Sequence, residues 1–180
     1  DARRLGSRRW LMWIERLRVG DLRCLAQVEL DLQSGLNFIL GSNGSGKTSL
    51  LESAYVISRG HSFRAGSRET LIRRGCEGLQ VFAQVRHPGS ETSQRLGLER
   101  RGGGWTGRLD DRPLERLTDL FRRCAVCCFE PGSHELVAGP SEPRRAFMDW
   151  GVFHVEQEFL AQWRYYQAAL KQRNALLKQD

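Results

Sequence analysis

The sequence has no apolar run long enough to span a lipid bilayer. It also has no stretch with the order of a secretory signal peptide, in which basic, apolar and small residues follow one another. These two absences argue against a membrane protein or an exported one. We therefore expect the chain to be cytoplasmic.

Cysteine is scarce and odd in number, with five residues in 180, so free thiols are expected in a chain without an export signal. Cys124 and Cys127 have the C-x-x-C spacing of some zinc sites. However, no second Cys or His pair stands at a matching spacing, and structural zinc requires four ligands. Both cysteines lie in the apolar run 124–129, so we interpret them as small buried hydrophobic residues.

Acidic residues are the minority charge, with 21 Asp and Glu against 28 Lys and Arg and a formal net charge of +7. The excess favours an anionic partner, but it does not distinguish nucleic acid from an acidic membrane surface. A solvated basic surface would have the same composition. Charge alone therefore does not assign a function.

The strongest motif matches G-x-x-x-x-G-K-[ST], the phosphate-binding P-loop. Its residues are Gly41, Ser42, Asn43, Gly44, Ser45, Gly46, Lys47 and Thr48. The glycines allow successive backbone N–H groups to converge on phosphate oxygens, and a helix that follows adds the positive end of its dipole. We expect Lys47 to reach the β- and γ-phosphates of a nucleotide and the Thr48 hydroxyl to ligate Mg²⁺.

The segments around the loop support this assignment. The apolar run 36–40 predicts a buried strand before the loop, and 49–57 has the apolar spacing of a helix after it. Residues 13–19 and 26–32 alternate between apolar and polar and predict two antiparallel strands further upstream. An ABC-type head has two such strands, whereas a Ras-like or kinase-like P-loop comes almost at the start of its domain.

The remaining pattern predicts a first lobe rich in strands and a second lobe of helices. The expected elements are strands at 79–85, 94–99, 105–109 and 125–129, a short strand or turn at 71–75, a hairpin turn at 110–111, a short helix within 113–124 and a long helical pattern over 155–178. We expect a kink near Gly151. We also expect the apolar stripe Phe159, Trp163, Tyr166, Leu170 and Leu177 to belong to a core.

These elements divide the chain into three parts. Residues 1–11 are expected to be a disordered basic lead. Residues 12–130 are expected to form an incomplete ABC-type ATP-binding lobe, and residues 131–180 the start of a helical second lobe that is cut at 180.

Several segments resemble the RecF family, the bacterial recombination mediator ATPases. They are the P-loop with Leu50, Leu51 and Glu52 behind it, Ser62-Phe63-Arg64, and the segments 71–75, 136–139, 144–151 and 170–177. The P-loop is shared across the whole superfamily, whereas Arg-Arg-x-Phe-x-Asp at 144–149 and Leu-Lys-Gln-Arg-Asn at 170–174 are specific to RecF. The resemblance covers residues 12–180.

The resemblance implies an α/β fold, that of an ABC-type P-loop ATPase head with a mixed sheet and an antiparallel β subdomain, followed by a helical lobe. It implies ATP and Mg²⁺ as cofactors, an ATP-dependent homodimer, and binding to gapped or single-stranded DNA junctions. It further implies cooperation with RecO and RecR in loading a recombinase, with roles in DNA replication, repair and SOS induction. Arg64 resembles an arginine that related heads place near nucleotide and DNA, and Arg73 and Arg74 are expected near the same face.

The sequence departs from the family pattern in what would complete the ATPase. A Walker B strand ending in Asp-Glu and a signature loop are not found in the 180 residues. The run 125–129 followed by Glu130 imitates Walker B but lacks the preceding Asp that would hold Mg²⁺. We therefore assign no catalytic residue. We expect weak DNA-dependent ATPase activity of the full-length family and negligible turnover by this chain.

Three other interpretations remain open. Another SMC-like head with a coiled-coil arm would be favoured by sustained heptads after Lys171. A GTPase would need a guanine-reading Asn-Lys-x-Asp, and the sequence has no Asn-Lys pair; a nucleotide kinase would need an acceptor-binding lid. A DNA-binding module with a vestigial P-loop would be separated from the others by titration with ATP.

Overall fold

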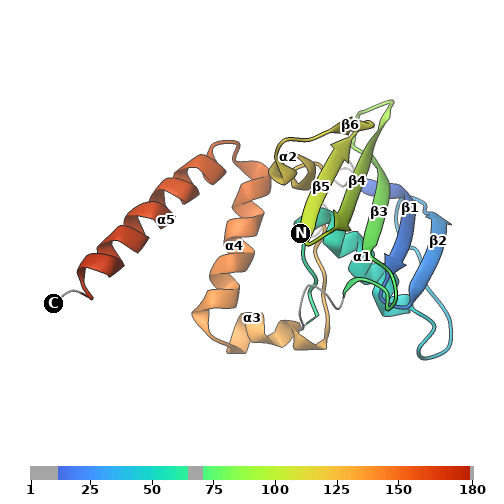
Figure 1. Cartoon of the computed structure of the whole chain (residues 1–180), viewed down its shortest axis with the longest axis horizontal. Helices are drawn as coiled ribbons and strands as arrows, with labels where there is room; N and C mark the ends of the chain where they lie inside the picture. The colour runs from blue at the N-terminus through green and yellow to red at the C-terminus, as the bar shows by residue number, and fades with distance from the viewer. Residues whose placement is uncertain (1–11, 65–70, 179–180) are drawn as a thin grey trace, which may run out of the picture. The chain divides into compact units, whose positions relative to one another are not determined.

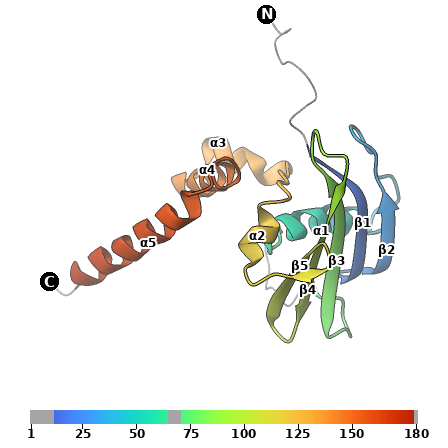
Figure 2. The ribbon, with the colours of Figure 1, turned by 90° about the horizontal axis from the view of Figure 1, so that it is seen from above.

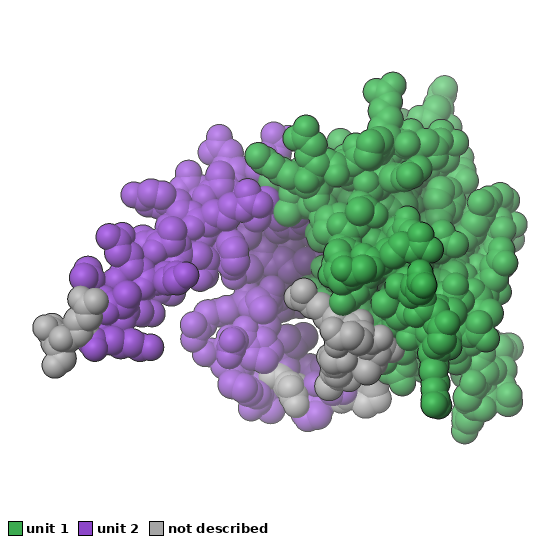
Figure 3. Space-filling model, viewed as in Figure 1, with its two compact units in different colours: residues 1–128 green, residues 129–180 purple. Residues whose placement is uncertain are grey.

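The computed structural model describes residues 12–64 and 71–178, and the elements below belong to these ranges. The chain divides into two compact units, residues 1–128 and 129–180, which are coloured separately in Figure 3. The predicted lead at 1–11 lies outside the described residues. No helix in the described ranges has the length and apolar character needed to cross a membrane.

The first unit is built on an antiparallel sheet whose strand order is β2-β1-β3-β4-β5-β6 (Figure 1). The strands are β1 (Trp13–Leu22), β2 (Leu25–Asp31), β3 (Gly78–Arg86), β4 (Ser93–Arg101), β5 (Gly104–Leu109) and β6 (Arg112–Pro113). The strands predicted from alternation at 13–19, 26–32, 79–85, 94–99 and 105–109 are all present. The predicted turn at 110–111 joins β5 to β6, with both aspartates at positive φ.

Alternation along the strands places the core on one face of the sheet. Inward-pointing residues of β1, β3 and β4 are buried, among them Leu17, Val19, Val81, Leu96 and Leu98. Helix α1 (Lys47–Arg59) and the short helix α2 (Leu117–Phe121) pack on that face, as Figure 2 shows from above, and the opposite face carries no helix formed by the described residues of this unit. The P-loop helix is therefore fixed directly against the sheet.

Two apolar runs predicted as strands are not strands. Residues 36–40 and 125–129 form no β-ladder with any described residue. Leu36, Phe38 and Leu40 are 81–88% exposed, and Ile39 alone packs against the core. An apolar run needs a partner edge for its backbone hydrogen bonds as well as a surface to cover its side chains. The described residues supply no partner edge, and they cover only part of each run, such as Ile39 and Val126.

The five cysteines are free thiols, but they do not share one environment. Cys124 is fully buried, and burial raises its pKa to about 12, as expected of a small core residue. Cys127 is exposed, so its assignment to a core was wrong. The reason is that the segment containing it does not form the buried strand that the apolar run suggested.

The second unit consists of helices. They are the 3₁₀ turn η3 (Pro131–His134), α3 (Glu135–Ala138), α4 (Ser141–Val155) and α5 (Phe159–Leu176). Helix α4 continues through Gly151 and ends at Val155, since one glycine costs a helix only about 1 kcal/mol. The indole Nε1 of Trp163 in α5 donates to Asp149 of α4 at 3.2 Å.

The predicted apolar stripe of α5 is not a core among the described residues. Trp163 is 38% exposed, Tyr166 58% and Leu177 59%, and no described residue of α4 or α5 is fully buried. Helical spacing predicted the helix correctly, but the spacing of apolar residues does not indicate what covers the apolar face.

Candidate nucleotide-binding site

The P-loop leads into helix α1 in the way the motif requires. Gly44 and Gly46 have φ of +82° and +96°, a region that residues with a Cβ rarely adopt. Gly46 is the N-cap, and no side chain in the described ranges caps the helix. The first intrahelical bond runs from Leu50 N–H to Gly46 C=O at 2.9 Å. The N–H groups at the start of α1 are therefore free of side-chain caps and directed toward the loop, where an anion would lie.

Lys47 already points back over the loop. Its Nζ donates to the carbonyl oxygens of Gly41 at 2.8 Å and Ser42 at 2.7 Å. These two bonds hold the ammonium group over the loop, where its N–H groups could exchange the carbonyl oxygens for phosphate oxygens. Thr48, the next residue, is exposed, so its hydroxyl is accessible to a metal ion.

The turn between β1 and β2 supports the start of α1. A Cβ on Gly46 would lie 2.7 Å from Leu25 Cδ2 and 3.3 Å from Cys24 Sγ, so only glycine allows this close approach. Cys24 Sγ also lies 3.6 Å from Ser49 Oγ on α1. The end of the P-loop is therefore fixed by the sheet as well as by its own helix.

A buried carboxylate on α1 connects this turn to the segment after the helix. Glu52 is fully buried and accepts hydrogen bonds from Arg23 at 2.8 Å (Nη2) and 3.1 Å (Nε) and from the Ser62 hydroxyl. It also forms an ion pair with Arg64, whose Nη1 lies 3.5 Å from Oε2. Arg23 takes positive φ, at 55°, to reach it. Glu52 thus contacts three side chains, one from the segment before the P-loop helix and two from the segment after it.

The structure locates each predicted site residue in the first unit. The P-loop residues lie together at the start of α1, and Arg64 contacts that helix through its ion pair with Glu52. Arg73 forms an ion pair with Asp21 at 3.7 Å, and its N–H bonds Asp21 C=O at 2.8 Å. Arg74 is exposed in the adjacent turn. Arg64 and Arg73 are therefore both connected to the β1–β2 turn, Arg64 through Glu52 and Arg23.

Sequence reasoning missed Arg23, Glu52 and Ser62 as site residues. A signal was present for Glu52, because it shares a helical face with Ser49 and Val56 and so stands at a core-facing position. A carboxylate at such a position needs a buried partner. Nothing in the local pattern indicates that Arg23, at positive φ, is that partner.

The pKa of Glu52 reflects this environment. Burial raises the pKa, but the hydrogen bonds from Arg23 and Ser62, with the charges of Arg23 and Arg64, outweigh burial and lower it overall. The pKa of Glu52 in the folded chain is therefore below its value in the unfolded chain, which is about 4.3. The stability that Glu52 contributes is then fully present above that pH and is lost as pH falls through the lowered value.

We expect Glu52→Gln to reduce the free energy of unfolding at pH 7 by on the order of 3 kcal/mol, because it removes one partner of a buried pair. The loss should shrink as pH falls below the unfolded pKa of about 4.3 and through the lowered folded value, since wild type loses the same contribution there. Urea unfolding at several pH values measures both effects. Glu29→Gln, which changes the same charge at a half-exposed position, is the control. A loss that is independent of pH would contradict this account.

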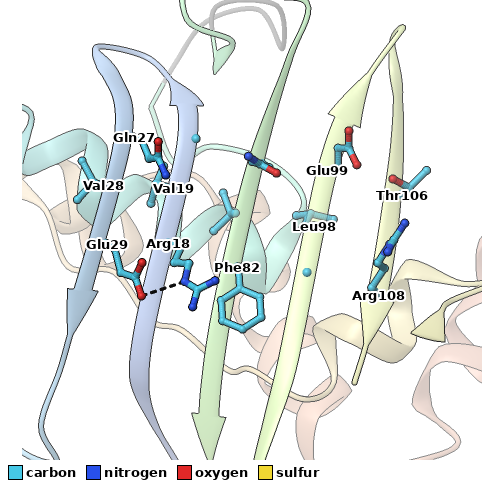
Figure 4. A pocket seen from close by; sticks show the side chains of 14 residues that line it. Arg18, Val19, Gln27, Val28, Glu29, Phe82, Leu98, Glu99, Thr106 and Arg108 are labelled. Carbon is cyan, nitrogen blue, oxygen red and sulfur yellow. Dashed lines mark ion pairs between the residues drawn. The ribbon is translucent and has the colours of Figure 1, made fainter. Parts of the chain in front are cut away.

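A hollow on the open face of the sheet is another concave feature of the first unit (Figure 4). It has a volume of about 500 Å³, and Gly20 and Gly97 leave its floor without side chains. Arg18 pairs with Glu29 at 3.0 Å and lies over the Phe82 ring. Its charged lining is balanced, with Arg18 and Arg108 against Glu29 and Glu99. The hollow therefore lacks the surplus of positive charge that a phosphate site needs, and none of the P-loop residues lines it.

The apparent Walker B sequence has no metal-binding geometry. Residues 125–130 are not a strand, and Glu130 is exposed. The segment is attached to α1 by the Val126 N–H, which donates to Ser58 Oγ at 3.1 Å.

Comparisons with known proteins agree with this architecture. The model of the RecF/RecN/SMC N-terminal domain family matches residues 13–101. The chain is 50% identical over 171 residues to the DNA replication and repair protein RecF of Xanthomonas oryzae pv. oryzae (strain MAFF 311018). It is 49% identical over 173 residues to that of Stenotrophomonas maltophilia (strain R551-3). Each match covers 93% of this chain and 47% of the relative, so the chain spans about half the length of these relatives.

Solved structures show the same fold. A structure of the recombination mediator protein RecF with ATPrS is 25% identical with a TM-score of 0.80, covering 93% of this chain and 45% of that one. A structure from work on SMC ATPases is 17% identical with a TM-score of 0.60, covering 77% of this chain and 98% of that one, and it supports the fold alone.

An antiparallel sheet packed on a P-loop helix is the N-terminal lobe of an ABC/SMC-type ATPase head, which confirms the predicted fold class. The chain resembles the RecF/RecN/SMC N-terminal domain family over residues 13–101 and, among the relatives compared, is similar to RecF proteins over 93% of its length.

Proposed function

We propose that residues 41–48 bind ATP together with Mg²⁺. The observation that carries this proposal is the Lys47 ammonium, held over the loop by the carbonyl oxygens of Gly41 and Ser42. Backbone N–H groups of 41–48 would surround the phosphates, Lys47 would contact the β- and γ-phosphates, and the Thr48 hydroxyl would ligate Mg²⁺. A solved RecF that is 25% identical is described with an ATP analogue, which supports the choice of nucleotide.

Removal of the Thr48 hydroxyl tests the metal in this proposal. We expect wild type to bind fluorescent ATP more tightly with Mg²⁺ than with EDTA, because the metal bridges Thr48 and the phosphates. Thr48→Val should abolish that difference, whereas Thr48→Ser, which keeps the hydroxyl, should retain it. A Mg²⁺ effect of equal size in all three proteins would show that Thr48 does not hold the metal.

We further propose that the chain is the ATP-binding part of a RecF-type DNA replication and repair protein in the cytoplasm. ATP would join two heads in a homodimer, and the dimer would bind gapped or single-stranded DNA junctions. The whole protein would act with RecO and RecR to load a recombinase and would take part in SOS induction. Identity of about 50% to proteins named DNA replication and repair protein RecF, over 93% of the chain, supports this proposal.

We propose that DNA meets the basic side chains around the β1–β2 turn. Arg64, Arg73 and Arg74 lie there, and the acids in ion-pair contact with two of them are Glu52 and Asp21. Glu52 is also paired with Arg23, so this surface carries a positive surplus that the balanced hollow of Figure 4 lacks. Phosphate groups are attracted by such a surplus irrespective of base sequence.

A further inference from the structure

Arg64 is held at both ends by one small ring of contacts. Its backbone N–H donates to Ser62 Oγ at 2.8 Å, and the Ser62 hydroxyl donates to Glu52. Its guanidinium Nη1 lies 3.5 Å from Glu52 Oε2. Glu52 therefore fixes the backbone of Arg64 through Ser62 and the tip of its side chain directly.

The charges in this ring are unequal. Glu52 is already neutralised by Arg23, which approaches to 2.8 Å and is only 19% exposed. Arg64 is the second guanidinium on the same carboxylate, and it is 43% exposed. One buried negative charge thus faces two positive charges, and the surplus lies on the more exposed arginine. If Arg64 turned toward an anion, Glu52 would still have Arg23 as its partner.

We propose that Glu52 is a positioning residue, which presents the Arg64 guanidinium to a phosphate group. This inference rests on the proposed function, since the phosphate would belong either to the bound nucleotide or to DNA. A free arginine side chain has many rotamers, and restricting it beforehand reduces the entropy lost when it binds. Because Nη1 faces Glu52, the other N–H groups of the guanidinium remain for the phosphate.

The contacts of Ser62 and Glu52 that restrain Arg64, called the anchor below, can be tested without any ligand. Phenylglyoxal modifies accessible arginines, and mass spectrometry gives the rate at each site. We expect Arg64 to react several-fold faster in Glu52→Gln and in Ser62→Ala than in wild type, while exposed Arg108 in the same protein is unchanged. Ser62→Ala leaves all charges in place, so it remains informative if Glu52→Gln unfolds. Equal Arg64 rates in wild type and a folded variant would overturn the anchor.

The effect on binding is tested by a double-mutant cycle with Arg64→Ala. We expect Arg64→Ala and Ser62→Ala each to weaken binding by roughly tenfold or more, the cost of one hydrogen bond to a charged group. The double variant should bind no more weakly than Arg64→Ala alone. If the loss in the double variant equalled the product of the two single losses, Ser62 and Glu52 would act only on the fold, and the proposal would be overturned. The same cycle is run for Glu52→Gln wherever melting shows it folded.

The cycle is measured once with MgATP and once with gapped duplex DNA. Coupling with MgATP assigns the phosphate to the nucleotide, and coupling with DNA alone assigns it to nucleic acid. Binding by wild type without coupling to either ligand overturns the positioning role and leaves the proposed function intact. If the wild-type chain binds neither ligand, the proposed function and the proposed contact of Arg64 with a phosphate are both overturned. The modification rates would still decide whether Glu52 and Ser62 restrain Arg64.

Discussion

ATP binding should fall by at least about a hundredfold in Lys47→Ala, with the fold retained. In the structure the Lys47 ammonium donates to two loop carbonyls, and with ATP bound the same donors would move to β- and γ-phosphate oxygens. Hydrogen bonds to charged groups contribute about 1.5–3 kcal/mol each, so the loss of two exceeds the threshold for a hundredfold effect. Lys47 begins helix α1 and is not part of the buried core, and alanine favours a helix.

Two controls accompany this variant. Lys171→Ala removes the same charge from an exposed position in α5 and should leave the affinity for ATP unchanged. Thermal melting of Lys47→Ala should match wild type, which separates loss of the site from loss of the fold. Calorimetric titration with MgATP measures the affinities. An unchanged affinity in Lys47→Ala would remove Lys47 from the site.

DNA affinity should fall steeply with salt, by about a thousandfold between 50 and 200 mM if about six phosphates are contacted. Each phosphate contact releases about 0.9 counterions from duplex DNA, so the slope of log affinity against log salt counts the contacts. Arg73→Ala with Arg74→Ala should flatten that slope by about two units, one per lost contact. Base sequence should matter little, because phosphate contacts carry no base code.

The open face of the sheet provides the matched control for this titration. Arg18→Ala with Arg108→Ala removes the same charge from the hollow of Figure 4, where two glutamates balance the two arginines. We expect its slope to equal that of wild type. The titration uses gapped duplex with ATP and Mg²⁺ present at each salt concentration. Equal slopes for wild type and the Arg73 and Arg74 variant would show that DNA does not meet the β1–β2 turn.

Local patterns in the sequence were sufficient for strands β1 to β5 and for the helix after the P-loop, but not for the short strand β6. Alternation over 13–19 and 79–85 predicted β1 and β3, because one face of each strand is buried and the other is not. The glycine spacing and Lys47 predicted the loop and the start of α1. The pairing order was not predicted, since nothing local states that β1 lies between β2 and β3.

The two wrongly predicted strands, 36–40 and 125–129, fail for a common physical reason. Apolar composition indicates that a segment can be buried, but a strand also needs a neighbour with free backbone groups. The described residues offer no such neighbour, and Phe38 is 81% exposed. The α5 stripe fails in the same way, because helical spacing identifies an apolar face without identifying what covers it.

The contacts around Glu52 show what local sequence patterns could not predict about the site. The P-loop could be predicted because its residues are contiguous and each has a defined chemical role. Glu52, Arg23 and Ser62 come from three segments, and only the folded chain brings them together. A core-facing carboxylate indicated that some partner existed, but the partner itself depended on the backbone of the β1–β2 turn.

Titration of the ¹⁵N-labelled wild-type chain with MgATP, followed by amide NMR shifts, tests most directly whether residues 41–48 are a nucleotide site. We predict saturable changes centred on the amides of 41–48 and the first turn of α1, because those N–H groups would bind the phosphates. The amides of β1 and β4 that border the hollow of Figure 4 should move little. Absence of saturable changes, or changes centred on that hollow instead of the P-loop, would contradict the account.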